Sequence, residues 1–180
     1  MPILLSDTGP LISAFQSDSL NLLVTLFGSV HSTETCVNEL VRHGWGEILK
    51  QVEGLLVIHT LTKSEKDDAL AVARKIAAHP IAKDHDPKNH LGEAEVMALA
   101  RRTEFEGAVI LLDELAARAT ASELGLTISG FAGVLLLAVE AGLLTPKELR
   151  ERLEHCRKLG THYSTSFSES IFQLAQAGVK

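Results

Sequence analysis

The sequence predicts an α/β fold, a three-layer α/β/α sandwich around a short and mainly parallel central sheet. Short apolar runs alternate with longer segments of helical periodicity, which is the pattern of parallel strands joined by crossover helices. The runs are rich in Leu, Ile and Val, as strands buried on both faces are. Two of them end near an aspartate, Asp7 and Asp113, at the position where open α/β sheets bind ligands.

Each element follows from its local pattern. Strands are expected at the apolar runs 2–6, 29–31, 55–59, 108–112 and 126–128. Helices are expected over 9–15, 18–27, 34–43, 46–52, 64–78, 92–103, 114–124, 130–141, 145–158 and 166–176. Thr145 before Pro146 is a typical helix start, and Ser64 is expected to open another helix with a capping box. The polar stretch 79–90 is expected to be a loop.

Length and composition indicate one domain over residues 1–180, with residues 145–180 as a helical C-terminal extension. Hydrophobic residues make up 46% of the chain, which excludes a disordered protein. The net charge is −6 and aromatics are only 4%, so binding of nucleic acid would need metal ions or a local basic patch. Lys147, Arg150, Arg152, Arg157 and Lys158 alternate with glutamates, which predicts a solvated helix face instead.

The expected compartment is the cytoplasm. The amino terminus has no basic segment of the kind that signal peptides carry, and no apolar stretch is long enough to cross a bilayer, so no membrane contact is expected. The two cysteines, Cys36 and Cys156, lie far apart and form no CxxC pair, as expected of reduced thiols. His85 and His90 match no zinc-binding spacing.

Three acidic positions stand where a metal site could collect them. Asp7 and Asp113 follow predicted strands, and Glu93 follows Gly92 at the start of a predicted helix. Carboxylates are the ligands that Mg²⁺ prefers, and bound Mg²⁺ suits phosphodiester chemistry. No phosphate-binding loop, dinucleotide fingerprint or nucleophilic-serine elbow competes with this interpretation.

Each of these residues also has a purely structural interpretation. Asp7 and Asp113 could cap the helices that follow them, and Glu93 would be favoured at a helix start by the helix dipole. Arg118 could form an i,i+4 pair with Glu114, or else reach a phosphate or orient Asp113. Glu39 falls off the buried stripe of its helix, as solvated charges do. Thr8 could support Asp7.

Taken together, the motifs resemble the PIN domain family, and more narrowly the PIN-like proteins related to VapC toxins that carry a GEAE motif. The resemblance rests on Leu4-Leu5-Ser6-Asp7-Thr8-Gly9-Pro10, Glu39-Leu40-Val41, Gly92-Glu93-Ala94-Glu95, Leu111-Leu112-Asp113-Glu114 with Arg118, and the run 126–136. The motifs keep the family's order from residue 2 to about 145. The third acid is Glu where many VapC-type nucleases have Asp, and Ser129-Gly130 replaces a frequent Thr-rich turn.

The resemblance implies a metal-dependent ribonuclease. Carried over residue by residue, Asp7, Glu39, Glu93 and Asp113 would hold Mg²⁺ or Mn²⁺, with Asp7, Glu93 and Asp113 as the catalytic acids. Thr8 and Arg118 would support them or contact the phosphate. The resemblance also implies an RNA substrate, an antitoxin partner and a homodimer. Two other hypotheses remain open: a catalytically silent PIN-like module that binds nucleic acid or protein, and an α/β domain whose acids only cap helices.

Overall fold

The computed structural model describes residues 3–178 and contains one five-stranded sheet with the strand order β3-β2-β1-β4-β5. Every neighbouring pair of strands is parallel. The strands are β1 (Leu4–Ser6), β2 (Val30–Thr33), β3 (Leu56–His59), β4 (Val109–Leu111) and β5 (Thr127–Ser129). The predicted fold class is therefore confirmed, and the predicted strands lie within two residues of the observed ones; residue 2 of the first lies outside the described residues.

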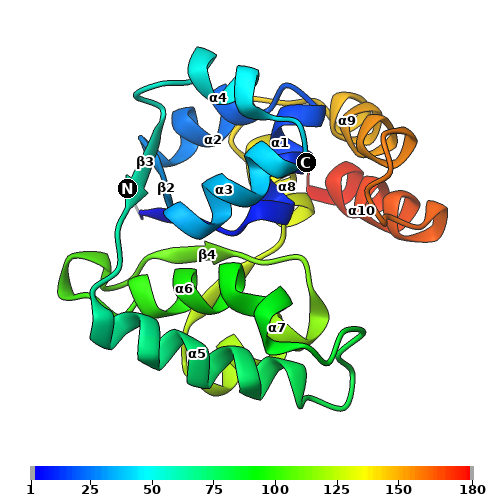
Figure 1. Cartoon of the computed structure of the whole chain (residues 1–180). Coiled ribbons are helices and arrows are strands. Elements are labelled where there is room, and N and C mark those ends of the chain that lie inside the picture. The colour runs from blue at the N-terminus through cyan, green and yellow to red at the C-terminus, as the bar shows by residue number, and fades with distance from the viewer. Residues whose placement is uncertain (1–2, 179–180) are drawn as a thin grey trace.

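Helices connect the strands and cover both faces of the sheet (Figure 1). They are α1 (Thr8–Gln16), α2 (Leu20–Phe27), α3 (Glu34–Arg42), α4 (Gly46–Gln51), α5 (Lys63–Ala77), α6 (Leu91–Leu99), α7 (Leu115–Glu123), α8 (Phe131–Glu140), α9 (Pro146–Lys158) and α10 (Thr165–Gly178). The polar stretch 79–90 is a loop that ends in a short 3-10 helix, Pro87–His90. The helix predicted over 92–103 ends earlier, at Leu99.

The three layers follow from the alternation of side chains along each strand. In β1, Leu4 joins one core cluster together with residues of α1, α2 and α8, whereas Leu5 joins the other with residues of α5, α6 and α7. In β4, Leu111 belongs to the same cluster as Leu4, and Ile110 belongs to the same cluster as Leu5. Figure 1 shows the corresponding arrangement, with α5, α6 and α7 together on one side of β4.

Helix starts agree with the sequence at one place and differ at another. Thr145 caps α9 with Pro146 in the first turn, as predicted, and its side chain and that of Glu148 form the reciprocal hydrogen bonds of a capping box. The start predicted at Ser64 is wrong. Thr62 caps α5 instead, because its hydroxyl accepts from the amide of Glu65 and the Glu65 side chain accepts from the amide of Thr62.

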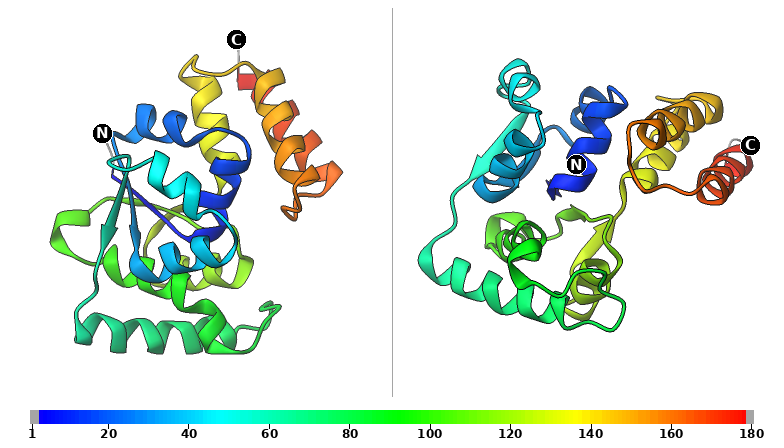
Figure 2. Two further views of the ribbon diagram at one scale, coloured as in Figure 1. Left: turned by 45° about the horizontal axis from the view of Figure 1, so that its top comes forward. Right: turned by 45° about the vertical axis from the view of Figure 1, so that its right-hand side comes forward.

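The C-terminal helices α9 and α10 pack side by side against α8, at one side of the sheet (Figure 2). The prediction that the basic side chains of α9 form a solvated helix face is wrong for Arg152. Its guanidinium donates to the carbonyls of Ser17 and Asp18 and to the hydroxyl of Ser19, in the turn that follows α1. In α10, Ile171 and Ala175 pack on the core, while Phe167 and Leu174 remain 40% and 58% exposed.

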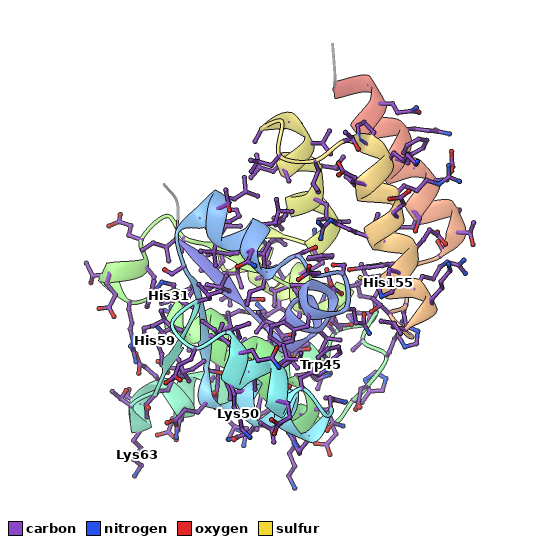
Figure 3. All side chains as sticks on the ribbon, turned by 90° about the horizontal axis from the view of Figure 1, so that it is seen from above. His31, Trp45, Lys50, His59, Lys63 and His155 are labelled. Atoms are coloured by element: carbon purple, nitrogen blue, oxygen red, sulfur yellow. The ribbon has the colours of Figure 1, made fainter. Side chains whose placement is uncertain are left out.

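Figure 3 shows His31 of β2 and His59 of β3 pointing toward one another at the β3 edge of the sheet. Their ring nitrogens lie 2.9 Å apart and Phe105 packs edge-on against both rings. Both cysteines are buried free thiols, as predicted. Among the described residues, no helix is both long and apolar enough to cross a membrane.

Candidate active site

Asp7 lies between β1 and α1, at the carboxyl end of two adjacent inner strands. Its amide donates to the carbonyl of Leu111 in β4, with an N···O distance of 3.2 Å, and the register pairs Ser6 with Leu111. Asp7 occupies the N-cap position of α1, but its side chain makes no capping hydrogen bond and the residue is only 7% exposed. The helix-cap interpretation of Asp7 thus holds for its position but is not supported by a capping hydrogen bond of its side chain.

Glu39 and Gly92 approach Asp7 from two other helices. A Cβ atom added to Gly92 would lie 2.9 Å from Asp7 Oδ1, 3.3 Å from Glu39 Oε2 and 3.4 Å from Cys36 Sγ. The hydroxyl of Thr8 donates to Glu39 Oε2 at 2.6 Å. Glu39 was expected on the solvated side of its helix, yet its side chain is only 22% exposed because it turns toward this contact. Because Gly92 has no side chain, a space remains open between the carboxylates of Asp7 and Glu39. We call this space the cradle.

Glu93, at the start of α6, completes an acidic cluster with Asp7 and Glu39. Burial raises the pKa of Asp7 well above its ordinary range, and the neighbouring Glu93 raises it further. Burial also raises the pKa of Glu93 to about 7, with added repulsion from Glu39 and Glu114. Both shifts favour the protonated forms of Asp7 and Glu93 when no cation is bound, and a bound cation would favour their ionised forms.

His90 lies beside this cluster with one ring nitrogen unused. Nε2 lies 2.9 Å from the carbonyl oxygen of Asp84, so Nε2 carries the hydrogen and donates it. Nδ1 is buried, has no hydrogen-bond partner and lies 3.8 Å from Glu93 Oε1. The other salt-bridge contact to the cluster among residues 3–178 is Arg42, 3.8 Å from Glu39 Oε1. A buried, unsatisfied nitrogen therefore faces an acidic cluster that has little compensating positive charge.

Asp113 lies after β4 and is held from two directions. Its Oδ1 accepts from the amide of Phe131, the first residue of α8, at 3.1 Å, and its Oδ2 accepts from the hydroxyl of Tyr163 at 3.2 Å. Burial raises the pKa of Asp113, opposed by these two hydrogen bonds and by the charge of Arg118. The interpretation of Asp113 as the cap of the helix that follows it is wrong, because Glu114 caps α7 by accepting from the amide of Ala117 at 2.6 Å.

Arg118 stands against the backbone that precedes Asp113. Its Nη1 donates to the carbonyl of Leu112 at 2.8 Å, and its charge acts on Asp113. The predicted alternative of an i,i+4 ion pair between Glu114 and Arg118 is not found, since the Glu114 carboxylate is turned toward the α7 amide instead. The other predicted roles of Arg118, orienting Asp113 or reaching a phosphate, stay predictions, and its hydrogen bond is to the carbonyl of the residue before Asp113.

Sequence reasoning missed three residues at this place: Tyr163, His90 and Gly92. Tyr163 lies 50 residues after Asp113, so no local spacing could link them. His90 directly precedes the Leu91-Gly92-Glu93 segment, and this proximity was the only available signal. The predicted acids Asp7, Glu39 and Glu93 come together, whereas the recorded contacts of Asp113 are with Phe131 and Tyr163 and not with this cluster. As they stand, no three His, Cys, Asp or Glu side chains of residues 3–178 form a closed metal-binding group.

A comparison with family models bears on this arrangement. A model described as a PIN domain matches residues 3–177. The chain belongs to the PIN domain family. PIN domains are generally nucleases, and PIN nucleases generally use divalent metals. The parallel five-stranded sheet between helical layers is consistent with a PIN domain. Neither curated proteins nor solved structures give a significant match to the chain.

Proposed function

We propose that this PIN domain is a metal-dependent endoribonuclease whose ion is held by Asp7, Glu39, Glu93 and Asp113. The observation that carries the proposal is the convergence of Asp7, Glu39 and Glu93, from the end of β1 and from two helices, at the carboxyl ends of inner strands where ligands commonly bind. A salt bridge or helix cap would not need this convergence, and neither role accounts for the raised pKa values of Asp7 and Glu93.

The residues present fit a hard divalent cation. All four proposed ligands offer carboxylate oxygens, which Mg²⁺ and Mn²⁺ prefer. The absence of a Cβ at Gly92 leaves room between Asp7 and Glu39, and the unsatisfied Nδ1 of His90 borders Glu93. Binding would require the carboxylates to draw closer to one another, because in the described residues they do not yet enclose a common point.

The proposed chemistry divides between the ion and the chain. A bound divalent cation would lower the pKa of a water molecule and neutralise charge on the scissile phosphodiester. Asp7 and Glu93 would supply the negative charge that retains the cation, and Thr8 would orient Glu39 through its 2.6 Å hydrogen bond. Arg118 would fix the backbone at Leu112 and turn its remaining donors toward a phosphate.

The test is cleavage of a mixed RNA pool with Mg²⁺ or Mn²⁺ by the wild type, Asp7→Asn and Asp113→Asn. We expect metal-dependent cleavage by the wild type and a loss of at least 100-fold in either variant, as on removal of an essential catalytic group. Equal cleavage by all three proteins would identify a contaminating nuclease. Folded wild-type protein that binds metal but leaves every RNA intact would overturn the enzymatic proposal.

That last outcome would favour a second candidate, a catalytically silent module that binds nucleic acid or protein. The net charge of −6 favours it, because a nuclease must approach a polyanion. Such a module would bind a metal or a partner without cleaving RNA.

The resemblance to VapC-related proteins supports a further proposal, that this ribonuclease is the toxin of a toxin–antitoxin pair and acts as a homodimer in the cytoplasm. An antitoxin peptide would then block the site by inserting an Arg or Lys among the carboxylates. Induced expression should arrest growth, and Asp7→Asn should relieve the arrest. Unaffected growth with active enzyme would remove the toxin role and leave the ribonuclease.

A further inference from the structure

The hydroxyl of Tyr163 connects the C-terminal segment to Asp113, one of the four proposed metal ligands. It reaches Asp113 Oδ2 from the segment that joins α9 to α10, at 3.2 Å. The second oxygen of the same carboxylate takes the Phe131 amide at 3.1 Å. One donor on each oxygen fixes both the position and the rotation of the carboxylate. Since each oxygen has two lone pairs, one on each remains free to face a cation.

Tyr163 is itself held in place on several sides. Its oxygen lies 3.3 Å from the hydroxyl of Ser13, which is buried in α1. The phenol donates its hydrogen to Asp113, which leaves Ser13 to donate to the Tyr163 oxygen. The ring stacks on Phe167 of α10, with ring centroids 5.5 Å apart and an interplanar angle of 24°. A side chain fixed in this way can orient a second one.

We propose that Tyr163 is a positioning residue for the metal site, acting through its hydrogen bond to Asp113. The inference rests on the proposed function, since it requires Asp113 to be a metal ligand. Outer hydrogen-bond partners of metal ligands fix their orientation, and losing one typically weakens metal affinity by about 10–100-fold. Tyr163 is not a catalytic residue in this scheme, because it touches the ligand and not the substrate.

Tyr163→Phe tests the role by deleting only the hydroxyl. We expect its dissociation constant for Mn²⁺, measured from the paramagnetic resonance signal of the free ion, to rise about 10-fold or more. Thr161→Val is the matched control. Thr161 donates to Gln16 Oε1 at 2.6 Å, so this variant loosens the same segment without touching Asp113, and its Mn²⁺ affinity should equal that of the wild type.

A double-mutant cycle separates positioning from general loosening. In an Asp113→Asn background, adding Tyr163→Phe should weaken Mn²⁺ binding no further, because the hydroxyl no longer acts on a ligand. Equal, additive losses in both backgrounds would overturn the positioning role. So would a Tyr163→Phe protein that binds Mn²⁺ as tightly as the wild type does. If the wild type itself binds no Mn²⁺, the proposed metal site fails and the inference fails with it.

A second measurement needs no variant at Tyr163 and guards against a misfolded one. Tyr163 is the only tyrosine of the chain. The ring vibrations of its phenol in ultraviolet resonance Raman spectra are distinct from those of the Trp45 indole and therefore report on one side chain. Saturating Mg²⁺ should shift such a band in the wild type but not in Asp113→Asn. An unshifted band in wild-type protein that has bound Mg²⁺ would contradict the coupling of Tyr163 to the site.

Discussion

Gly92 lies where three side chains converge, which makes it the most sensitive small residue of the site. Gly92→Ala would gain helix propensity of about 1 kcal/mol, but its Cβ would stand 2.9 Å from Asp7 Oδ1. We expect the crowding to prevail, with a net loss of about 1–2 kcal/mol in the free energy of unfolding and weaker Mn²⁺ binding.

Urea denaturation and Mn²⁺ titration measure these two effects. Gly46→Ala is the control, because its Cβ would meet only the Val41 methyl groups at 3.9 Å and 4.0 Å. A Gly92→Ala protein that is more stable than the wild type and binds Mn²⁺ equally well would show that the cradle has no role.

The raised pKa values at the site predict how stability depends on pH. The pKa of Glu93 rises from an ordinary 4.5 to about 7 on folding, because of burial and of repulsion from Glu39 and Glu114. Between these two values the folded state keeps a proton that the unfolded state has lost. Stability of the metal-free protein should therefore fall as pH rises from about 4.5 through 7, by roughly 3 kcal/mol from Glu93. Asp7 acts in the same direction.

Urea denaturation in a chelating buffer at pH 5 and pH 8 checks this slope. Glu93→Gln should flatten it and raise stability at pH 8. Glu47→Gln, at a side chain that is 82% exposed, should keep the wild-type slope. An unaltered slope in Glu93→Gln would contradict the role assigned to its carboxyl.

The residue scale also shows where the sequence was informative. Asp7 and Asp113 were proposed from the ends of apolar runs, Glu93 from a helix start and Glu39 only from the resemblance to PIN domains, but the partners of each carboxylate were not predicted. Asp113 and Glu114 are adjacent, and only the backbone direction after β4 decides that Glu114 caps α7 while Asp113 reaches Phe131 and Tyr163. Such a choice depends on tertiary packing, which no spacing encodes.

At the scale of elements, Arg152 joins α9 to the turn after α1. One guanidinium nitrogen serves three acceptors there: the carbonyls of Ser17 and Asp18 and the Ser19 hydroxyl. Asp18 has a positive φ of 49°, which costs energy in a residue with a side chain, and Arg152 helps to hold that turn. Arg152→Met should therefore lower the free energy of unfolding by about 1.5–3 kcal/mol.

Arg157→Met is the control for Arg152→Met. Arg157 pairs with Glu154 on its own helix, and an exposed pair of this kind is worth about 0.5 kcal/mol. Urea denaturation of both variants should separate them clearly. Equal losses would show that the turn does not depend on Arg152.

Helix boundaries reveal the same limit of sequence reasoning. The Thr145 start was predictable because Thr, Pro and Glu stand at their preferred positions within four consecutive residues. At α5, Thr62 and Ser64 were both acceptable caps, and the deciding fact was the position of Glu65, three residues after Thr62. Helical periodicity gave the existence of the elements more reliably than their ends.

For the whole molecule, the proposed metal site predicts stabilisation by ligand. At 100-fold excess over the dissociation constant, Mg²⁺ or Mn²⁺ should add about 2.7 kcal/mol, which corresponds to roughly 5–10 °C in Tm for a chain of this size. Thermal unfolding with metal and with chelator measures it, and Asp7→Asn should abolish most of the difference. Identical Tm values for the wild type in both buffers would contradict metal binding to the folded state.

The fold was predictable as a whole because its signal repeats along the chain. Each strand is a short apolar run, each crossover is a helical segment, and consistency among many weak signals selects one architecture. The placement of the C-terminal helices was not predictable in this way. Their amphipathic faces indicated that something is covered, but not that Tyr163 would lie against a strand-end carboxylate.

The position of Tyr163, 50 residues after Asp113, has a consequence for how the proposed site is assembled. During translation the four acids emerge from the ribosome first. Tyr163, whose hydroxyl holds Asp113, emerges 50 residues after Asp113. If Tyr163 positions Asp113, a growing chain has all of its acids but an incompletely ordered site. Full nuclease activity would then arise only after Tyr163 has left the ribosome, and so later than the emergence of the four acids.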